Sequence, residues 1–238
     1  KDMDVAREQA RREKKEHGTL AFPLQIYPAL DGSEADDSDF IPYHWHPELE
    51  IITVDAGHVS LTIADHTYEG THGDVFFAAG EELHEIRAAG RENQFRSFVF
   101  AADFLQFSRA DQSEFALLSP LAEGRLRFGT CIRAGEPGQN EIRTLLAQIV
   151  RAWQGQAPGW QLAVKAALLG IVAVCAQYGR LVGHQMRPGA DYKAQQLKEI
   201  VGYLGEHFTE PLSLSAVAAE FGLSPPDFSP LFPGNFGR

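Results

Sequence analysis

The chain carries three histidines and one glutamate at positions from which a small β-barrel could gather them around one point. The segment YHWHPELEIITVDAG contains His44, His46 and Glu50, and the segment GDVFFAAGEELH ends at His84. His44, His46 and Glu50 share one parity, so a single strand through them would send all their side chains to one face. A second strand would have to bring His84 there. Imidazole nitrogens and a carboxylate oxygen suit zinc, iron, nickel or manganese, and leave open positions for water or a small molecule.

A metal-free pocket could use the same side chains. Histidine pairs near a barrel mouth also line sites for organic ligands, where they form hydrogen bonds without a metal. Glu48 has the parity of Glu50, so either carboxylate could belong to the group. Aromatic residues on these strands are either pocket wall or core. The residues expected to form an effector site are His44, His46, Glu50, His84, Tyr43 and Phe76.

The remaining histidines are expected in other settings. Loops or solvent-facing positions are predicted for His58, His66 and His72. Helical or linker positions are predicted for His17, His184 and His207. None of these six is therefore expected to be a ligand.

Composition narrows the class of protein. With 238 residues and 44% hydrophobic content, the chain is long enough for one barrel plus one or two small helical units. A net charge of −11 argues against a generally basic nucleic-acid coat and against attraction to a membrane surface, so any DNA contact must be local. Cys131 and Cys175 show no paired spacing, which argues against a disulfide framework or a thiolate zinc site. A reducing compartment, the cytoplasm, is expected.

The chain is expected to be a mixed α+β protein with its barrel near the N-terminus. Residues 1–19 form a charged extension without the apolar stretch of a secretory signal, and a solvated helix is predicted there. Residues 20–110 contain short runs such as EIITV, VSLTIA and FRSFVF, separated by glycines and acidic turns. Many short strands at such spacing indicate a barrel or sandwich. We therefore place the effector-binding barrel in residues 20–110.

Residues 111–187 have helical periodicity. Apolar residues recur at intervals of three and four from about Asn140 to just before Gly155, which predicts an amphipathic helix. A second, apolar helix is expected from about Pro158 to Tyr178. It is long enough to span a membrane, but its Lys165 and flanking glutamines favour a buried soluble helix or a dimer contact. The two helices are predicted either to form a homodimer face or to cap the barrel.

Residues 191–238 have the layout of a helix-turn-helix DNA reader. One helix is predicted through Leu204, and Ser213 can cap a short second helix that ends at Phe221. After a glycine turn, Ser224 can cap a third segment with Pro225 at its first position. Such a last helix lies in the major groove. The residues expected to contact or position DNA are Ser213, Ser224, Pro225, Phe228 and Ser229.

These motifs carry two family resemblances. His44, His46, Glu50 and Gly57 match the spacing of the first motif of cupin barrels, which favours Glu50 over Glu48. The stretch EPLSLSAVAAEFGLSP resembles the first helix-turn-helix of AraC/XylS-type transcription regulators, and HWHPELEI, GDVFFAAGEELHEI and GRLRF resemble their effector domain and linker. The resemblance implies a homodimeric regulator whose barrel senses a small molecule and whose helix-turn-helix units bind DNA.

The chain departs from these patterns at both motifs. Ala79 stands where cupins usually have proline and Glu81 where they have glycine, and no asparagine follows His84 at the expected distance. In the last segment, Pro230 and Pro233 would each cost a helix interior roughly 3 kcal/mol. Residues 191–238 carry three basic and six acidic side chains, which is a poor match to DNA phosphates. We therefore expect a sensor with an incomplete reader.

Three classes of function follow. The first is a ligand-gated transcription regulator that is not an enzyme. The second is a metal-dependent cupin enzyme that uses His44, His46, Glu50 and His84 as ligands, and it would need an acid or base within reach. The third is an interaction module that dimerises through its helices. Metal analysis with an activity screen separates the first two, and light scattering tests the third.

Overall fold

The fold was analysed in a computed structural model. It describes residues 11–13, 15–27, 40–88 and 92–184, together with single positions at Ile200, Tyr203, Val217, Ala218, Glu220 and Phe221. The strands are β1 (Arg11–Arg12), β2 (Leu24–Tyr27), β3 (Phe40–Trp45), β4 (Leu49–Ala56), β5 (His58–Ile63), β6 (His66–Thr71), β7 (Val75–Ala78), β8 (His84–Arg87), β9 (Gln94–Phe100), β10 (Leu126–Phe128), β11 (Cys131–Ile132) and β12 (Leu181–Gly183). The helices are α2 (Ser119–Ala122), α3 (Gln139–Gly155) and α4 (Trp160–Gln177), with a 3-10 turn η1 (Ala102–Leu105) and a π-helical turn η2 (Glu114–Leu118).

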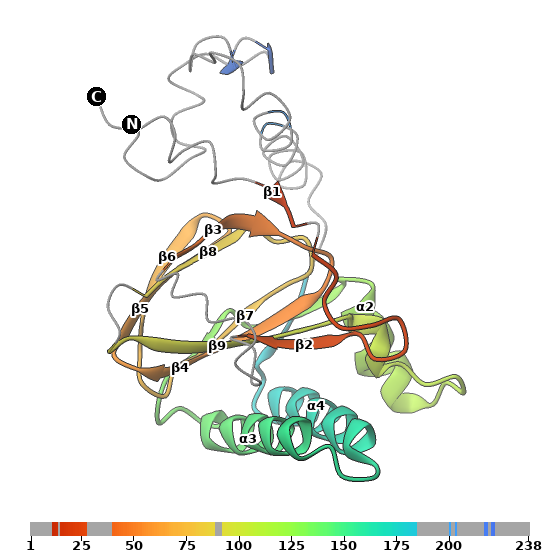
Figure 1. Cartoon of the computed structure of the whole chain (residues 1–238). Helices are drawn as coiled ribbons and strands as arrows, with labels where there is room; N and C mark the ends of the chain where they lie inside the picture. Colours follow the sequence, from red (N-terminus) through yellow and green to blue (C-terminus); the bar gives the residue numbers. More distant parts are fainter. Residues whose placement is uncertain are drawn as a thin grey trace.

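Two sheets face each other and enclose an apolar interior. One has the strand order β1-β3-β8-β5-β6 and the other β11-β7-β4-β9-β2, and every pairing except that of β1 with β3 is antiparallel. Figure 1 shows them as opposite walls. The enclosed core joins residues of both sheets: Ile52, Val54, Val59, Leu61, Ile63, Phe76, Ile86 and Ala88. The expected mixed fold with a cupin-like domain is confirmed.

Helices α3 and α4 cover the outer face of the second sheet (Figure 1). Leu49 and Ile51 of β4 point to this side, because side chains alternate along a strand. They share a core with Ile142 and Leu146 of α3 and with Leu168 of α4. The amphipathic helix predicted from about Asn140 is α3, and the apolar helix predicted from Pro158 is α4. Their buried faces pack on the sheet, which is the arrangement expected if the helices cap the barrel. The homodimer stays a prediction.

Helix α4 is long and apolar enough to cross a membrane by length and composition alone. Its side chains at Val164, Ala167, Leu168, Ile171, Val172 and Cys175 are nevertheless buried in the core shared with the sheet. A core helix of a globular domain passes the same length test, and this packing explains the apolar composition.

A single strand through His44, His46 and Glu50, which would place their side chains on one face, is not what the structure has. Strand β3 ends at Trp45 and β4 begins at Leu49. Pro47 has no N–H to give to a sheet, so the chain bends there. The carbonyl of His46 accepts a hydrogen bond from the N–H of Glu81 (2.7 Å) instead of one from a strand.

The predicted N-terminal helix is also wrong for the part that the structure describes. Arg11 and Arg12 pair in parallel with His44 and Trp45. The N–H of Glu13 continues this pairing by donating to the carbonyl of Trp45 (3.0 Å). In the strand, backbone groups of this segment form hydrogen bonds with the exposed edge of β3. Charge pairs along an isolated helix would have stabilised the helix only weakly.

In the C-terminal region, Ile200 and Tyr203 are helical, as are Val217, Ala218 and Glu220. The rings of Tyr203 and Phe221 lie 5.5 Å apart between centroids. These positions agree with the helices predicted through Leu204 and up to Phe221. The residues predicted to contact DNA lie outside the described residues: Ser213, Ser224, Pro225, Phe228 and Ser229.

Candidate metal and ligand site

The structure brings together the four side chains that the sequence singled out. Ligand atoms of His44, His46, Glu50 and His84 all lie within 4.8 Å of one another. His84 is 1% exposed, His46 2% and Glu50 4%. The end of β3, the following turn, the start of β4 and the start of β8 each supply one of them. The group therefore comes from short segments that meet at one end of the barrel.

Strand register explains the meeting. Strands β3 and β8 are antiparallel, and their register places His44 opposite His84. The two rings lie 4.2 Å apart between centroids. In β4, Glu50 has the parity of the core residues Ile52 and Val54, so its carboxylate points to the interior. The bend at Pro47 folds His46 back onto the group, and its Nε2 donates to Oε2 of Glu50 (3.1 Å).

Backbone hydrogen bonds orient two of the imidazoles. Nδ1 of His44 donates to the carbonyl of Pro42 (2.9 Å). Nδ1 of His84 donates to the carbonyl of Glu82 (2.8 Å). Each bond fixes a ring orientation in which Nε2 faces the centre of the group. Metal-binding histidines use the same arrangement, in which the second ring nitrogen is anchored to a carbonyl or carboxylate.

A proton holds the buried group together without a metal. Nε2 of His84 donates to Oε2 of Glu50 (2.9 Å), so both nitrogens of His84 donate and the ring is an imidazolium. Burial opposes this charge, but the Glu50 carboxylate outweighs burial and raises the pKa of His84. Burial likewise opposes the Glu50 anion, and His84 and His46 together hold the pKa of Glu50 well below its usual range. A cation at this point is therefore favoured.

His44 behaves differently. Burial and the neighbouring positive charge of His84 lower the pKa of His44 to about 4. Its imidazole is therefore neutral near pH 7, with the Nε2 lone pair facing the group. A neutral imidazole with a free lone pair is the form that binds a metal ion.

Glu48, the alternative carboxylate, lies beside the group rather than within it. Its Oε2 is 3.5 Å from Nδ1 of His46. Among the described residues, these are two of the buried side-chain atoms without a hydrogen-bond partner. A metal on Nε2 of His46 would make Nδ1 a better donor toward Glu48. The four residues thus fit a divalent metal by the types of their donor atoms and by the anchored rings of His44 and His84. The nearby Glu48 could also accept a hydrogen bond from Nδ1 of a metal-bound His46.

Two further residues reach the group from the N-terminal segment. Oε2 of Glu13 lies 3.6 Å from Nε2 of His44 and 3.4 Å from Nε2 of His17. The His17 ring is 5.0 Å from that of His46, and its Nδ1 lies 3.0 Å from the hydroxyl of Tyr27. Glu13, His17 and His46 could themselves hold a metal ion. The expectation that His17 has no role in the site is at odds with this placement.

The aromatic candidates fall in two places. Tyr43 lies near Thr62 and Glu85, on the face of the sheet opposite to the four ligands. This placement does not favour Tyr43 as a pocket residue beside the histidines, and its role in binding stays a prediction. Phe76 is fully buried in the barrel interior, opposite Ile52 in the β4–β7 register. It shares the interior face with Glu50, and its role in binding stays a prediction.

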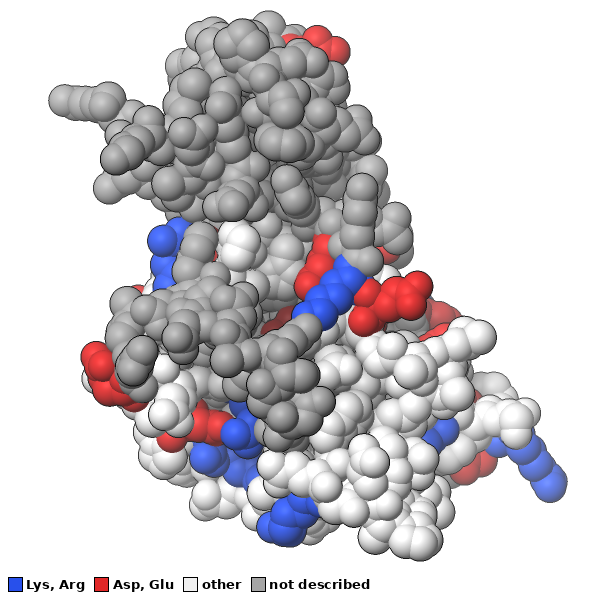
Figure 2. All heavy atoms as spheres, in the orientation of Figure 1, with Lys and Arg blue, Asp and Glu red and all other residues white. Residues whose placement is uncertain are grey.

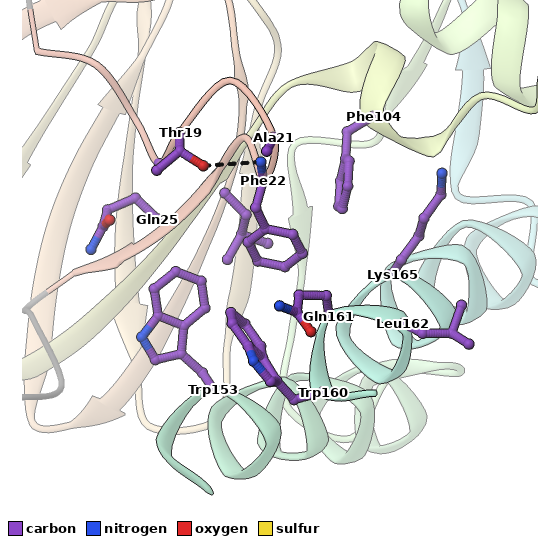
Figure 3. Close-up of a pocket in the computed structure, with 12 residues that line it drawn as sticks. Thr19, Ala21, Phe22, Gln25, Phe104, Trp153, Trp160, Gln161, Leu162 and Lys165 are labelled. Atoms are coloured by element: carbon purple, nitrogen blue, oxygen red, sulfur yellow. Dashed lines mark hydrogen bonds between the residues drawn. The ribbon is translucent and has the colours of Figure 1, made fainter. Parts of the chain in front are cut away.

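A groove lies outside the barrel, between the segment before β2 and the two long helices (Figure 3). Its volume is about 680 Å³. Phe22, Phe104, Trp153 and Trp160 form its aromatic lining, and Lys165 stands at one side. The ring of Phe22 lies 4.9 Å from that of Trp160. The aromatic rings thus pack chiefly on one another, in contrast to the polar group within the barrel.

Charged side chains of both signs are intermixed over the face drawn in Figure 2. Among the described residues, this face offers no extended basic surface for DNA.

The predicted solvent positions of three histidines agree with the structure, since His58, His66 and His72 are exposed.

The sequence as a whole can be compared with known families. The family described as the AraC-like ligand binding domain matches residues 27–172. The chain belongs to this family. The match begins in β2, includes the four clustered residues and extends through α3 into α4, so the helices belong to the ligand-binding unit together with the barrel.

Similarities to solved structures are short. Oxalate decarboxylase of Bacillus subtilis, studied for its Mn(II) centres, is 24% identical over 26% of this chain and 18% of its own, with a TM-score of 0.24. A conserved protein of unknown function from Streptococcus pyogenes is 23% identical over 26% of this chain and 53% of its own, also with a TM-score of 0.24. The chain therefore spans less than two thirds of either protein. A comparison with curated proteins gives no match.

Proposed function

We propose that this chain is the effector-binding part of a ligand-responsive transcription regulator, and that its ligand binds at a metal site within the barrel. The observation that carries the proposal is the group of four ligand residues, within 4.8 Å of one another, inside an AraC-like ligand-binding domain. Three imidazoles and one carboxylate leave coordination positions free for a ligand. The barrel is then a sensor and not an enzyme.

His44, His46, Glu50 and His84 would hold a divalent transition metal: zinc, nickel, iron or manganese. When bound, the metal supplies a positive centre that accepts donor atoms of the effector. The chain's own residues orient the ligands, since the carbonyls of Pro42 and Glu82 anchor two of the rings. Phe76 and the rest of the interior core exclude water from one side.

Ligand binding can be transmitted along two routes. Strand β3 carries His44 and pairs with β1 of the N-terminal segment. Strand β4 carries Glu50, and its opposite face packs on α3 and α4. A ligand that prefers one arrangement of either contact shifts the equilibrium toward that arrangement. In the intact regulator, this shift would change how two protomers of a cytoplasmic homodimer present their DNA-reading helices.

DNA binding is the other half of the proposal. It is supported by the resemblance of residues 210–225 to a helix-turn-helix and by the helical state of Val217, Ala218 and Glu220. Ser213, Ser224, Pro225, Phe228 and Ser229 remain the residues expected to contact or position DNA. Because this region carries a net negative charge, we expect weak and salt-sensitive binding by the 238-residue chain.

Metal analysis combined with ligand-dependent thermal stability tests the sensor proposal. The chain is expected to retain one equivalent of a divalent metal, and a ligand found in a small-molecule panel should raise its melting temperature only when metal is present. The Glu50→Gln variant should lose both effects. Metal-free protein that binds the ligand equally well would refute the metal site, and turnover of the ligand would assign an enzyme instead. A mobility-shift titration at low salt measures DNA binding separately.

A further inference from the structure

The N-terminal segment places a carboxylate at the site from outside the barrel. Glu13 contacts His44 (3.6 Å) and His17 (3.4 Å), and its side chain is 28% exposed. Ligand atoms of Glu13, His17 and His46 lie within 4.8 Å of one another. Three imidazoles thus surround one carboxylate that belongs to no strand of the barrel core.

Among the described residues, backbone pairing with β3 holds that carboxylate at the site. Strand β1 consists of Arg11 and Arg12, which pair with His44 and Trp45 at the edge of the first sheet. The Glu13 N–H adds one more hydrogen bond, to the Trp45 carbonyl (3.0 Å). A two-residue edge strand is weakly held compared with the six-residue ladder between β5 and β6. We expect it to open more readily than the longer ladders of the barrel.

We propose that Glu13 is an internal carboxylate ligand of the metal site, and that the effector is a small carboxylate that displaces it and releases β1. The inference rests on the proposed metal site and names its ligand class. His44 is a member of the four-residue group, so the Glu13 oxygen beside its Nε2 lies at the edge of the metal position. An external carboxylate would make the same contacts with His17, His44 and the metal.

The exchange conserves charge at the site. With a metal held by the four residues, one carboxylate would replace another beside the metal and the imidazoles, so no buried charge would be left unpaired. A neutral ligand of the same shape would leave the cationic group without its anion. Detachment of Glu13 also breaks the hydrogen bond to Trp45, and this couples ligand binding to the position of β1.

The test uses the full chain loaded with zinc, and two probes of similar shape, acetate and neutral acetamide. Glu13→Gln removes the internal ligand, and Glu16→Gln is the matched control, since Glu16 is an exposed carboxylate in the same segment. Trypsin cleavage at Arg11, Arg12 and Lys15 reports release of the segment. Calorimetry reports acetate binding, and circular dichroism verifies folding of each variant.

We expect acetate, and not acetamide, to speed cleavage of the zinc-loaded wild type and of the Glu16→Gln variant. Glu13→Gln should be cleaved rapidly without acetate and show no further effect. It should also bind zinc about tenfold more weakly, as expected for a lost metal contact, and bind acetate about tenfold more tightly because no internal competitor remains. Identical behaviour of the two variants, or equal responses to acetate and acetamide, would overturn the inference about Glu13. The proposed metal site would still stand in that case if the chain binds zinc. A wild-type chain that retains no zinc would instead refute the proposed metal site before any acetate is added.

Discussion

Glu81 donates its backbone N–H to the carbonyl of His46 at 2.7 Å, and it does so from a left-handed conformation with φ 62°. This bond joins the turn before β8, which leads to His84, to the turn that carries His46. The position is the one where cupins usually have glycine, because only glycine adopts positive φ without a steric penalty. The chain therefore has the left-handed backbone conformation that suits glycine at this position, but with glutamate in place of glycine.

Glu81→Gly should stabilise the protein. A non-glycine residue in the left-handed region costs about 1–2 kcal/mol, part of which the larger unfolded-state entropy of glycine offsets. We expect the free energy of unfolding in urea to rise by about 1 kcal/mol. Ala64→Gly, at φ 54° in the turn between β5 and β6, is the matched control and should give a similar gain. A loss of stability in Glu81→Gly alone would show that the carboxylate of Glu81 makes a contact worth more than the strain.

Metal binding should compete with the proton on His84. Glu50 raises the pKa of His84 above its usual value, so the metal-free site favours the protonated imidazole. The proton must leave when Nε2 binds a metal, so affinity for zinc should fall as pH decreases toward and below 6.5. Calorimetry in buffers of different ionisation enthalpy should find that zinc binding releases protons, and that more are released as the pH is lowered.

Glu50→Gln should weaken zinc binding by at least about tenfold and abolish most of this pH dependence, since the charge that raises the pKa of His84 is gone. Glu85→Gln is the control, because Glu85 is also buried but lies on the opposite face of β8 from His84. Equal zinc affinities in the two variants would mean that the metal does not bind at the four-residue group.

Both cysteines should be unreactive in the native protein. Burial raises the pKa of Cys131 to about 11 and that of Cys175 to about 12. At pH 8, the Cys131 thiol should hold roughly 200-fold less thiolate than an exposed cysteine and the Cys175 thiol roughly 2000-fold less, and the thiolate is the reactive species. Ellman's reagent should therefore label the chain slowly until urea unfolds it. Rapid labelling of one thiol under native conditions would show that its segment opens.

Local patterns predicted much of this structure. The apolar spacing of three and four residues predicted α3, and the apolar run predicted α4. Both signals are local, because the residues on the buried face of a helix recur at regular intervals along the chain. The ligand group followed from spacing, although the single strand assumed for it does not exist. Pro47 interrupts that strand, and the sequence alone did not predict that the resulting bend would bring His46 onto Glu50.

The missed features depend on contacts between distant segments. Glu13 and His17 look like members of a charged helix, and only the edge of β3 recruits them to the site. Ala79, where cupins usually have proline, donates its N–H to the carboxylate of Glu82 (3.0 Å), a bond that proline could not make. The contact of Glu13 with His44 cannot be inferred from a local pattern, since the two residues belong to segments far apart in the sequence.

Asp74 should be the most important buried charge outside the site. It is 2% exposed, and it accepts hydrogen bonds from the N–H groups of Thr71 (3.0 Å) and Ala134 (2.8 Å) and from the guanidinium of Arg133 (2.8 Å). These bonds connect the turn before β7 to the segment that leads into α3. Asp74→Ala removes the acceptor of these bonds and of one from the Thr71 hydroxyl, and we expect a loss of about 3 kcal/mol in unfolding free energy.

The pH dependence of stability provides the check. Burial would raise the pKa of Asp74, but the two N–H groups and Arg133 outweigh it and lower the pKa. A lowered pKa in the folded state means that the stabilisation is present above the unfolded value near 3.8 and is lost as pH falls below it. The difference in unfolding free energy between wild type and Asp74→Asn should therefore be constant from pH 7 to pH 5 and shrink below pH 4. A difference that persists unchanged at pH 3 would show that packing, and not the carboxylate charge, is what the substitution removes.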